Sequence, residues 1–215
     1  MKSGFKFVLI WLWLTIVATS MAEEGRYQVR FGGKLIGKAT MRLDKNPDGS
    51  IHFEGHVSMS LYGENIEWWQ SSLTAKDGMP VRYSYTEISG EDREIISATY
   101  EKEGVRVLVN AKDRSVSKVV PYPKGSIKAV AETWFVHVQP KVGQKAVYWS
   151  LDYDSLKWER EEEVYRGPKR ISVNGQSVVA HLITIGVEEM YLSQHGLPVR
   201  VSHGPTGQSL LIEKI

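Results

Sequence analysis

Apolar and polar residues alternate along most of this chain, which is the pattern of strands with one buried face. The stretch Ile51–Leu61 shows it most completely, with apolar and polar residues at successive positions. Glycine, proline and asparagine mark short turns between such stretches, as at Asn46–Gly49 and Asn174–Gly175. Many short strands with short connections predict a meandering antiparallel sheet, curled or closed enough to hide its edges. The predicted strands are residues 27–31, 34–43, 51–61, 66–73, 81–88, 95–100, 105–109, 116–120, 146–151, 158–165, 171–173, 178–185, 190–193, 197–201 and 210–212.

One segment, Ser126–Val138, follows a helical period instead. Its apolar stripe consists of Ile127, Val130, Ala131, Trp134, Phe135 and Val138, and Val136 points away from it. Ser126 stands at the N-cap position and Pro140 prevents a longer helix, although residues 133–138 also fit a strand. A lone amphipathic helix must bury its stripe against the sheet. The predicted fold is therefore mainly β: a curved antiparallel sheet or half-open β-barrel, with one amphipathic helix packed on the concave side.

A stretch that repeats within the chain points to turns. Residues 77–84 recur as residues 195–202, and each copy places Gly-x-Pro between two predicted strands. Glycine supplies a left-handed turn position and proline starts the outgoing strand. Duplication and independent convergence on the same turn chemistry both remain open.

The first 22 residues have the features of a signal peptide. Lys2 and Lys6 precede the apolar run Phe7–Val17, and Ser20-Met21-Ala22 supplies small residues for cleavage. The run is shorter than the about 20 residues of a membrane-spanning helix, so a retained anchor is the less favoured alternative. We expect residues 1–22 to be removed and residues 23–215 to form a single β-rich half-barrel domain. The expected location is the periplasm or the medium, without an integral membrane segment.

Charge and cysteine content exclude several functions. The formal net charge is +2, and Lys2 and Lys6 account for it, so residues 23–215 carry balanced charges. That balance gives no electrostatic footprint for nucleic acid or an anionic membrane surface. The chain has no cysteine, which excludes disulfides, thiolate metal sites, thiol catalysis and the acylated cysteine of a lipoprotein.

The sequence contains no established catalytic motif: a nucleophile elbow, a zinc-protease helix, a P-loop and a dinucleotide fingerprint are all missing. His52 and His56 lie on a predicted strand about 13 Å apart, so they cannot share a metal unaided and are expected to face solvent. The run Glu159–Glu163 is interpreted as a solvated edge. We predict no cofactor and no enzymatic activity.

Asp44–Gly49 resembles the opening half of a calcium loop, with alternating oxygen donors and glycine at the sixth position. Gly55, however, occupies the twelfth position, where such a loop has its bidentate Glu. The same residues fully explain a hairpin turn, and calcium remains the alternative.

Large aromatic side chains are the remaining chemical signal. They either pack the core or line an apolar pocket that one helix cannot fill. For the second case, the residues expected to line the pocket are Trp134 and Phe135 on the helix and Trp68, Trp149 and Tyr191 on facing strands.

The order of these parts is similar to that of a known family. The segments concerned are Val142-Gly143-Gln144, Val173-Asn174-Gly175-Gln176, and the strand–turn–strand of residues 191–201. They resemble an uncharacterised family of secreted bacterial β-proteins with a presumed fold like the lipoprotein-localisation factors LolA and LolB. The resemblance implies a half-open barrel in the periplasm, and members with known roles bind acyl chains in its concavity. The missing cysteine departs from the membrane-anchored receptors among them.

These observations together favour a periplasmic, non-enzymatic binding or chaperone-like protein for an apolar or acylated ligand. A structural or interaction protein of the cell envelope, which uses a strand edge or the polar face to hold a protein partner, is the first alternative. An envelope hydrolase built on carboxylates such as Glu132 or Asp152 is the second.

Overall fold

The structure is a computed structural model that describes residues 21–124, 131–203 and 210–215. Most of the predicted signal peptide and the first turn of the predicted helix, with Ser126, Ile127 and Val130, lie outside the described residues. The strands are β1 (Met21–Phe31), β2 (Lys34–Lys45), β3 (Ile51–Leu61), β4 (Glu64–Thr74), β5 (Pro80–Ser89), β6 (Asp92–Tyr100), β7 (Gly104–Ala111), β8 (Arg114–Pro121), β9 (Lys145–Asp152), β10 (Lys157–Val173), β11 (Gln176–Ile185), β12 (Glu188–Leu192), β13 (Pro198–His203) and β14 (Leu210–Lys214), with the helix α1 (Ala131–Val138) between β8 and β9.

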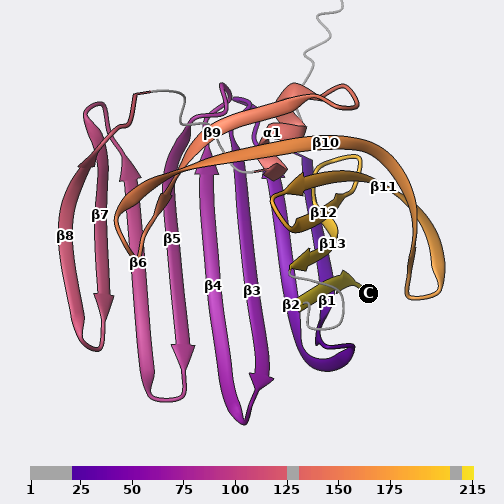
Figure 1. Ribbon diagram of the computed structural model, residues 1–215, viewed down its shortest axis with the longest axis horizontal. Coiled ribbons are helices and arrows are strands. Elements are labelled where there is room, and N and C mark those ends of the chain that lie inside the picture. Colours follow the sequence, from indigo (N-terminus) through magenta and orange to yellow (C-terminus); the bar gives the residue numbers. More distant parts are fainter. Residues whose placement is uncertain (1–20, 125–130, 204–209) are drawn as a thin grey trace, which may run out of the picture.

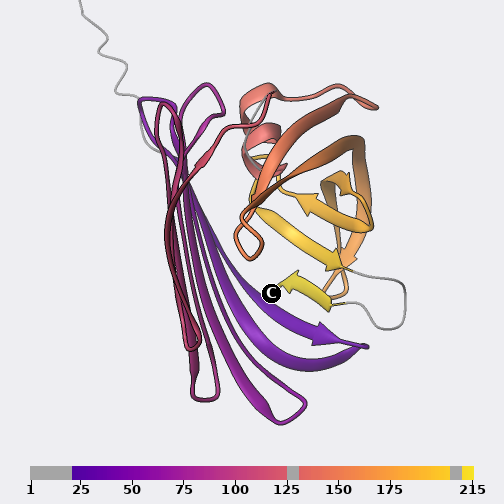
Figure 2. The ribbon, with the colours of Figure 1, turned by 60° about the vertical axis from the view of Figure 1, so that its left-hand side comes forward.

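The fourteen strands of the described residues belong to one antiparallel sheet in the order β8 to β1, then β14 to β9. Strands β1–β8 form a curved layer, and β9–β14 cross over its concave side (Figures 1 and 2). Pairing between β1 and β14 joins the two halves, whereas β8 and β9 are the two ends of the sheet. The predicted half-open β fold with one helix is confirmed. No helix among the described residues is long and apolar enough to cross a membrane.

Strand β10 is longer than the alternation predicts, since it merges the predicted strands 158–165 and 171–173. Pro168, which divides them, has no backbone N–H to donate to a neighbouring strand. Pairing of β10 with β9 ends at Val164, so Pro168 pairs only with β11. The register also shifts between Tyr165 and Gly167. Proline is tolerated here because this part of the long strand is an edge.

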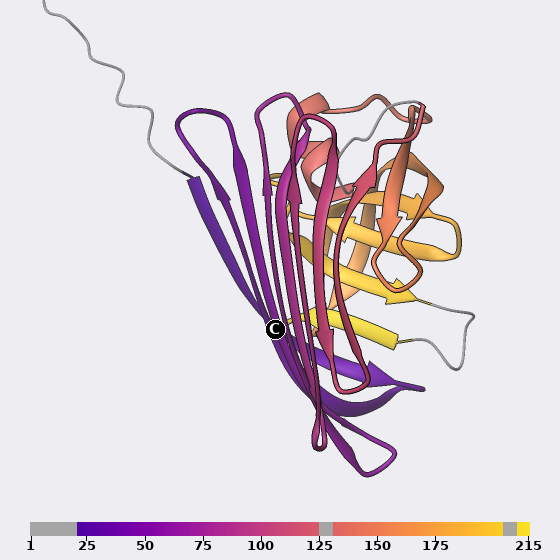
Figure 3. The same cartoon turned by 90° about the vertical axis from the view of Figure 1, so that its left-hand side faces the viewer.

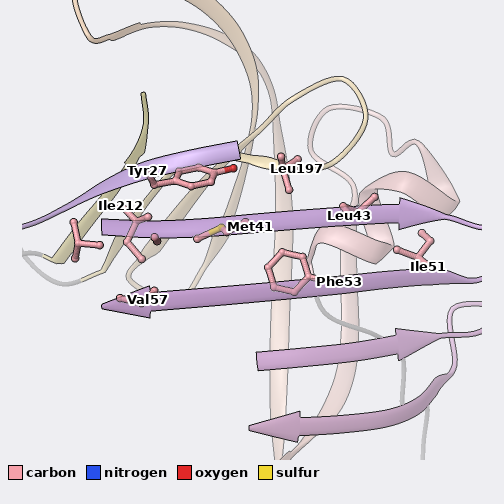
Figure 4. Close-up of a cluster of buried hydrophobic side chains, with 10 residues drawn as sticks. Tyr27, Met41, Leu43, Ile51, Phe53, Val57, Leu197 and Ile212 are labelled. Atoms are coloured by element: carbon pink, nitrogen blue, oxygen red, sulfur yellow. The ribbon is translucent and has the colours of Figure 1, made fainter. Parts of the chain in front are cut away.

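The largest buried cluster lies where the two halves meet (Figure 4). It combines inward side chains of β1–β3 with Leu197 and Ile212 from the second half. The hydroxyl of Tyr27 donates a hydrogen bond of 2.6 Å to the carbonyl of Pro198, which fixes β1 to the start of β13. This core contains Tyr27, Val29, Ala39, Met41, Leu43, Ile51, Phe53, Val57, Leu197 and Ile212.

Side chains, not a backbone ladder, close the gap between β8 and β9. The β9–β10 turn lies over the β6–β8 end of the first layer (Figure 3). In and beside this turn, Leu151, Tyr153 and Trp158 pack against the buried cluster of β6–β8. The indole of Trp158 donates to the carbonyl of Pro121 at 2.8 Å. The Tyr153 ring stacks on Tyr83, with centroids 4.8 Å apart. We call this contact region the seam.

The helix buries a different stripe from the predicted one. Trp134 and Phe135 are buried as expected, but Val138 is 47% exposed. Val136, predicted to point away, packs against both the β1–β3 core and the cluster of β10–β12. The prediction assumed that α1 rests on one sheet surface. It instead lies between the two halves of the folded sheet, so a second helical face is covered.

The acidic run of β10 is not a solvated edge throughout. Strand β9 pairs with this part of β10, so Glu159–Glu163 lie inside the sheet order. Glu163 is fully buried and accepts a hydrogen bond of 2.6 Å from the Tyr148 hydroxyl of β9. Glu162, on the other face, pairs with Lys145 in solvent. The edge interpretation was wrong for Glu163 because the sequence does not show which strand ends the sheet.

Candidate functional site

A cavity of about 760 Å³ lies between α1 and the two halves of the sheet. Its walls come from both ends of the chain, because β1 and β2 face β10, β11 and the turn before β13. We call it the helix pocket. It is lined by Met21, Ala22, Glu23, Leu43, Lys45, Phe135, Val136, Gln139, Pro140, Tyr165, His181, Gln194 and His195.

Three rings form the wall of the helix pocket beneath α1. Phe135 lies 4.7 Å from the His181 ring and 5.8 Å from Tyr165, centroid to centroid. The hydroxyl of Tyr165 and Nδ1 of His181 share a hydrogen bond of 2.7 Å. Burial lowers the pKa of His181 and raises the pKa of Tyr165, so both side chains are neutral near pH 7. This wall therefore offers aromatic faces and one neutral polar pair.

The rim of the helix pocket is polar. Glu23 accepts hydrogen bonds from the Ser193 hydroxyl at 2.7 Å and from Lys214 Nζ at 3.3 Å. The side chains of Gln194 and His195 are 2.9 Å apart. Lys45 also belongs to the lining, on the same strand as the apolar side chain of Leu43. An apolar interior with a polar rim is the arrangement that accepts an amphiphile.

The structure does not gather the five predicted lining residues in one cavity. Phe135 lines the helix pocket, and Trp134 is buried in the same cluster of side chains. Trp68 packs at the edge of the core on β4, 6.3 Å from the Tyr85 ring, and Trp149 on β9 is half-buried. Tyr191 lies beneath the Arg200 guanidinium at 6.0 Å and bonds Glu189. Its neighbour Leu192 is fully buried, so the two point to opposite sheet faces.

Sequence reasoning missed Tyr165, His181 and Lys45 as pocket residues. A signal was present in β11, where His181 interrupts the otherwise apolar run Ala180–Ile183. His181 is half-buried, and its Nδ1 shares a hydrogen bond with the hydroxyl of Tyr165, because a polar ring within such a run needs a partner. The pairing itself was not visible, because it depends on the register of β10 against β11.

A second hollow, of about 400 Å³, lies on the concave side near the seam. Three strands (β5, β6 and β9) and the turn after β9 line it, mainly with tyrosine rings and carboxylates: Tyr83, Tyr85, Glu87, Glu94, Ile96, Leu151, Asp152, Tyr153 and Asp154. Burial raises the pKa of Tyr83 to about 12. Burial, with the nearby carboxylates of Asp154 and Glu87, raises the pKa of Glu94. The hydrogen bond from Ser155 lowers the pKa of Asp152.

Both carboxylates of the Asp44–Gly49 turn already have partners in neighbouring residues. Asp44 is bound by Arg42 at 2.8 Å, and Asp48 accepts hydrogen bonds from the backbone and hydroxyl of Ser50. Within the described residues, no group of three or more His, Cys, Asp or Glu side chains is placed to hold a metal ion. His52 and His56 lie on the outer face of β3, half-buried: His52 bonds Ser71 and His56 stacks on Trp69.

Comparisons with known proteins agree with this fold. The chain is similar to the crystal structure of a "beta-barrel-like protein of domain of unknown function DUF1849" from Brucella abortus. The TM-score is 0.60 at 8% identity, and the match covers 89% of this chain and 94% of the other. At that identity the likeness concerns the fold alone. No curated protein matches the chain in sequence. The family model described as "protein of unknown function (DUF3108)" matches residues 26–202, so the chain belongs to the DUF3108 family.

Proposed function

We propose that this protein is a non-enzymatic carrier or chaperone-like protein that binds an apolar or acylated ligand in the helix pocket. The supporting observation is the cavity of about 760 Å³ beside Phe135, since ligand pockets usually measure about 300–1,000 Å³. Each methylene transferred from water into such a site contributes about 0.8 kcal/mol. The apolar part would lie against Leu43, Phe135 and Val136, with the polar end at the rim. The likeness to the lipoprotein-localisation factors is part of this proposal.

The proposed location is the periplasm, with removal of residues 1–22. Strand β1 begins at Met21, and both Met21 and Ala22 line the helix pocket. Cleavage after Ala22 would remove these two wall residues and leave the new amino group of Glu23 at the rim. The cleaved form would then have a wider pocket, which makes it the form to test.

A plugged pocket tests the proposal. Gln194 is exposed at the rim, so Gln194→Trp would fill the pocket mouth without disturbing the core. We expect this variant to bind the fluorescent fatty acid cis-parinaric acid at least about tenfold more weakly than the parent protein, a difference of ~1.4 kcal/mol. Fluorescence titration gives the dissociation constants, and native mass spectrometry of protein taken from the cell envelope reports a co-purifying ligand.

Gln176→Trp is the matched control, because Gln176 is also exposed but lies at the Asn174–Gly175 turn, away from the pocket lining. Equal binding by the two tryptophan variants, or an empty pocket in protein from the envelope, would contradict the proposal. Thermal unfolding of both variants separates lost binding from lost folding.

The hollow near the seam favours a second candidate, a hydrolase that uses carboxylates. Its Glu94 has a raised pKa and its Asp152 a lowered one, and opposite shifts in one cleft are typical of an acid and a base. The side chain of Glu132, the other carboxylate proposed for such an activity, lies outside the described residues. Asp152 already binds Ser155 and the backbone of Asp154 within the turn, which favours a structural role. Hydrolysis of purified peptidoglycan that Glu94→Gln abolishes would support this candidate.

A further inference from the structure

The β1–β2 and β3–β4 hairpin turns lie at the end of the sheet remote from α1 (Figure 2), and both carry exposed apolar side chains. Tyr62, in the β3–β4 turn, is 87% exposed, and Leu35, just after the β1–β2 turn, is 54% exposed. The rings of Phe31 and Tyr62 join the turns, with centroids 6.2 Å apart and planes at 75°. We call Phe31, Leu35, Leu61 and Tyr62 the apolar tip.

The backbone of Tyr62 is in a conformation that its side chain disfavours. Tyr62 has φ 53° and Gly63 has φ 87°, so both central residues of this two-residue hairpin are left-handed. Such turns favour Asn-Gly, and a bulky residue with positive φ is an outlier. The same chain uses the favoured pair at Asn174, φ 49°, and Gly175, φ 76°. Local turn preference therefore does not account for an exposed tyrosine at this position, and we take Tyr62 as a candidate for a role in binding.

Basic side chains flank only one of the two turns of the apolar tip. Arg30 and Lys34 flank the β1–β2 turn, whereas Glu64 is the one carboxylate in the segments 30–35 and 61–64. The Arg30 guanidinium donates to the Gly33 carbonyl at 3.2 Å and to the Gln28 side chain at 2.9 Å. Neither Arg30 nor Lys34 forms an ion pair with another described residue. Glu91 lies in the β5–β6 turn, next to the β3–β4 turn, where the N–H of Gly90 donates to the Asn65 carbonyl. The positive charge is therefore confined to the β1–β2 side of the apolar tip.

We propose that the apolar tip docks peripherally on an anionic lipid surface. Tyrosine rings prefer the headgroup level, aliphatic side chains reach the acyl boundary, and basic side chains attract lipid phosphates. The tip is a protrusion of fully paired hairpins, so it fits a deformable surface better than it fits a protein groove. The proposal does not depend on a ligand in the helix pocket, which lies at the opposite end near α1.

Substitution of Tyr62 separates this role from a structural one. Tyr62→Asn places a favoured residue in the left-handed position, so it should keep or raise the melting temperature. It should also lower the partition coefficient at least about fivefold on vesicles made of equal parts phosphatidylglycerol and phosphatidylcholine. Arg30→Gln should weaken binding about fivefold on these vesicles and leave binding to pure phosphatidylcholine unchanged. Co-sedimentation measures both effects.

Val187→Asn is the control, since Val187 is 72% exposed on the β11–β12 turn but lies outside the apolar tip. The variants differ at one residue each, so any contribution of residues 1–22 is common to all of them. Three results would overturn the proposal: no binding of the parent protein to anionic vesicles, equal binding by Tyr62→Asn, or a loss of stability in Tyr62→Asn that accounts for its lost binding. Capture of a protein partner by the tip without vesicle binding would also overturn it.

Discussion

Gly37 and Gly55 occupy neighbouring strands, yet only one of them has room for a side chain. A Cβ on Gly37 would lie 2.3 Å from the Ser58 carbonyl oxygen, which belongs to the paired strand. A Cβ on Gly55 would meet nothing closer than 3.6 Å, at the edge of the Phe53 ring. Neither glycine has a positive φ, so the difference between the two positions is one of space.

We therefore expect Gly37→Ala to lower the free energy of unfolding by about 2 kcal/mol, because Ser58 cannot move without disturbing the β2–β3 ladder. Gly55→Ala is the matched control, and it should be neutral or stabilise by up to about 1 kcal/mol through reduced freedom of the unfolded chain. Urea denaturation of both variants checks this. Equal losses in the two variants would show that the close approach at Gly37 relaxes easily.

Among the secondary-structure elements, the same kind of turn occurs at three places in the described residues. The turns at Asn46–Ser50, Ala75–Met79 and Ser193–Leu197 share the same two backbone hydrogen bonds, and each has a left-handed glycine at its fourth position. This confirms the turn predicted from the repeated segment. The turns fix the direction of the next strand locally. No turn of this kind fixes β9 against β8. The seam depends instead on contacts between side chains that are far apart in the sequence.

The seam predicts a contrast between two residues of β9. Leu151 is buried against the β6–β8 cluster, so Leu151→Ala should cost about 2–4 kcal/mol and should increase amide hydrogen exchange in β7 and β8. Val147 on the same strand is exposed, and Val147→Ala should change stability by less than about 0.5 kcal/mol. Unchanged exchange in β7 and β8 after loss of Leu151 would mean that the first half of the sheet holds itself together.

At the scale of the whole molecule, α1 is held between two halves of a single folded sheet. Its buried face touches both halves, so the helix and the helix pocket depend on how far the halves close over each other. Two histidines lie in this region. Burial lowers the pKa of His181, and burial with the positive charge of Lys45 lowers the pKa of His137. Both imidazoles therefore favour the neutral form in the folded protein.

This arrangement predicts a loss of stability in mild acid. Because the folded-state pKa of His181 lies below the unfolded value of about 6.5, the unfolded chain takes up the proton first as the pH falls. The free energy of unfolding should decrease below about pH 6.5, and His181→Gln should reduce that decrease. Urea denaturation at several pH values measures the free energy of unfolding of both proteins. Carboxylates titrate in both, so the difference between the two pH profiles reports the contribution of His181. Identical pH dependence of the two proteins would contradict the prediction.

The predicted and observed buried faces of the helix differ, because a local sequence pattern does not reveal a second packing surface. Trp134 and Phe135 were predicted correctly because a single stripe suffices to identify them. Val136 and Val138 were not, since their burial depends on a second packing surface that the helix sequence does not contain. Among the predicted lining residues, Trp68, Trp149 and Tyr191 were chosen by size, whereas strand direction and register place them away from the helix pocket.

Local sequence patterns suffice to predict the strands, the turns and the mainly β fold, because alternation and left-handed glycines act between residues close along the chain. The tertiary structure decided which strands end the sheet, that β1 pairs with β14, and that α1 lies between the halves. These features depend on contacts between residues far apart along the chain. The helix pocket is built from such contacts, so it could not be read from any one stretch of the chain.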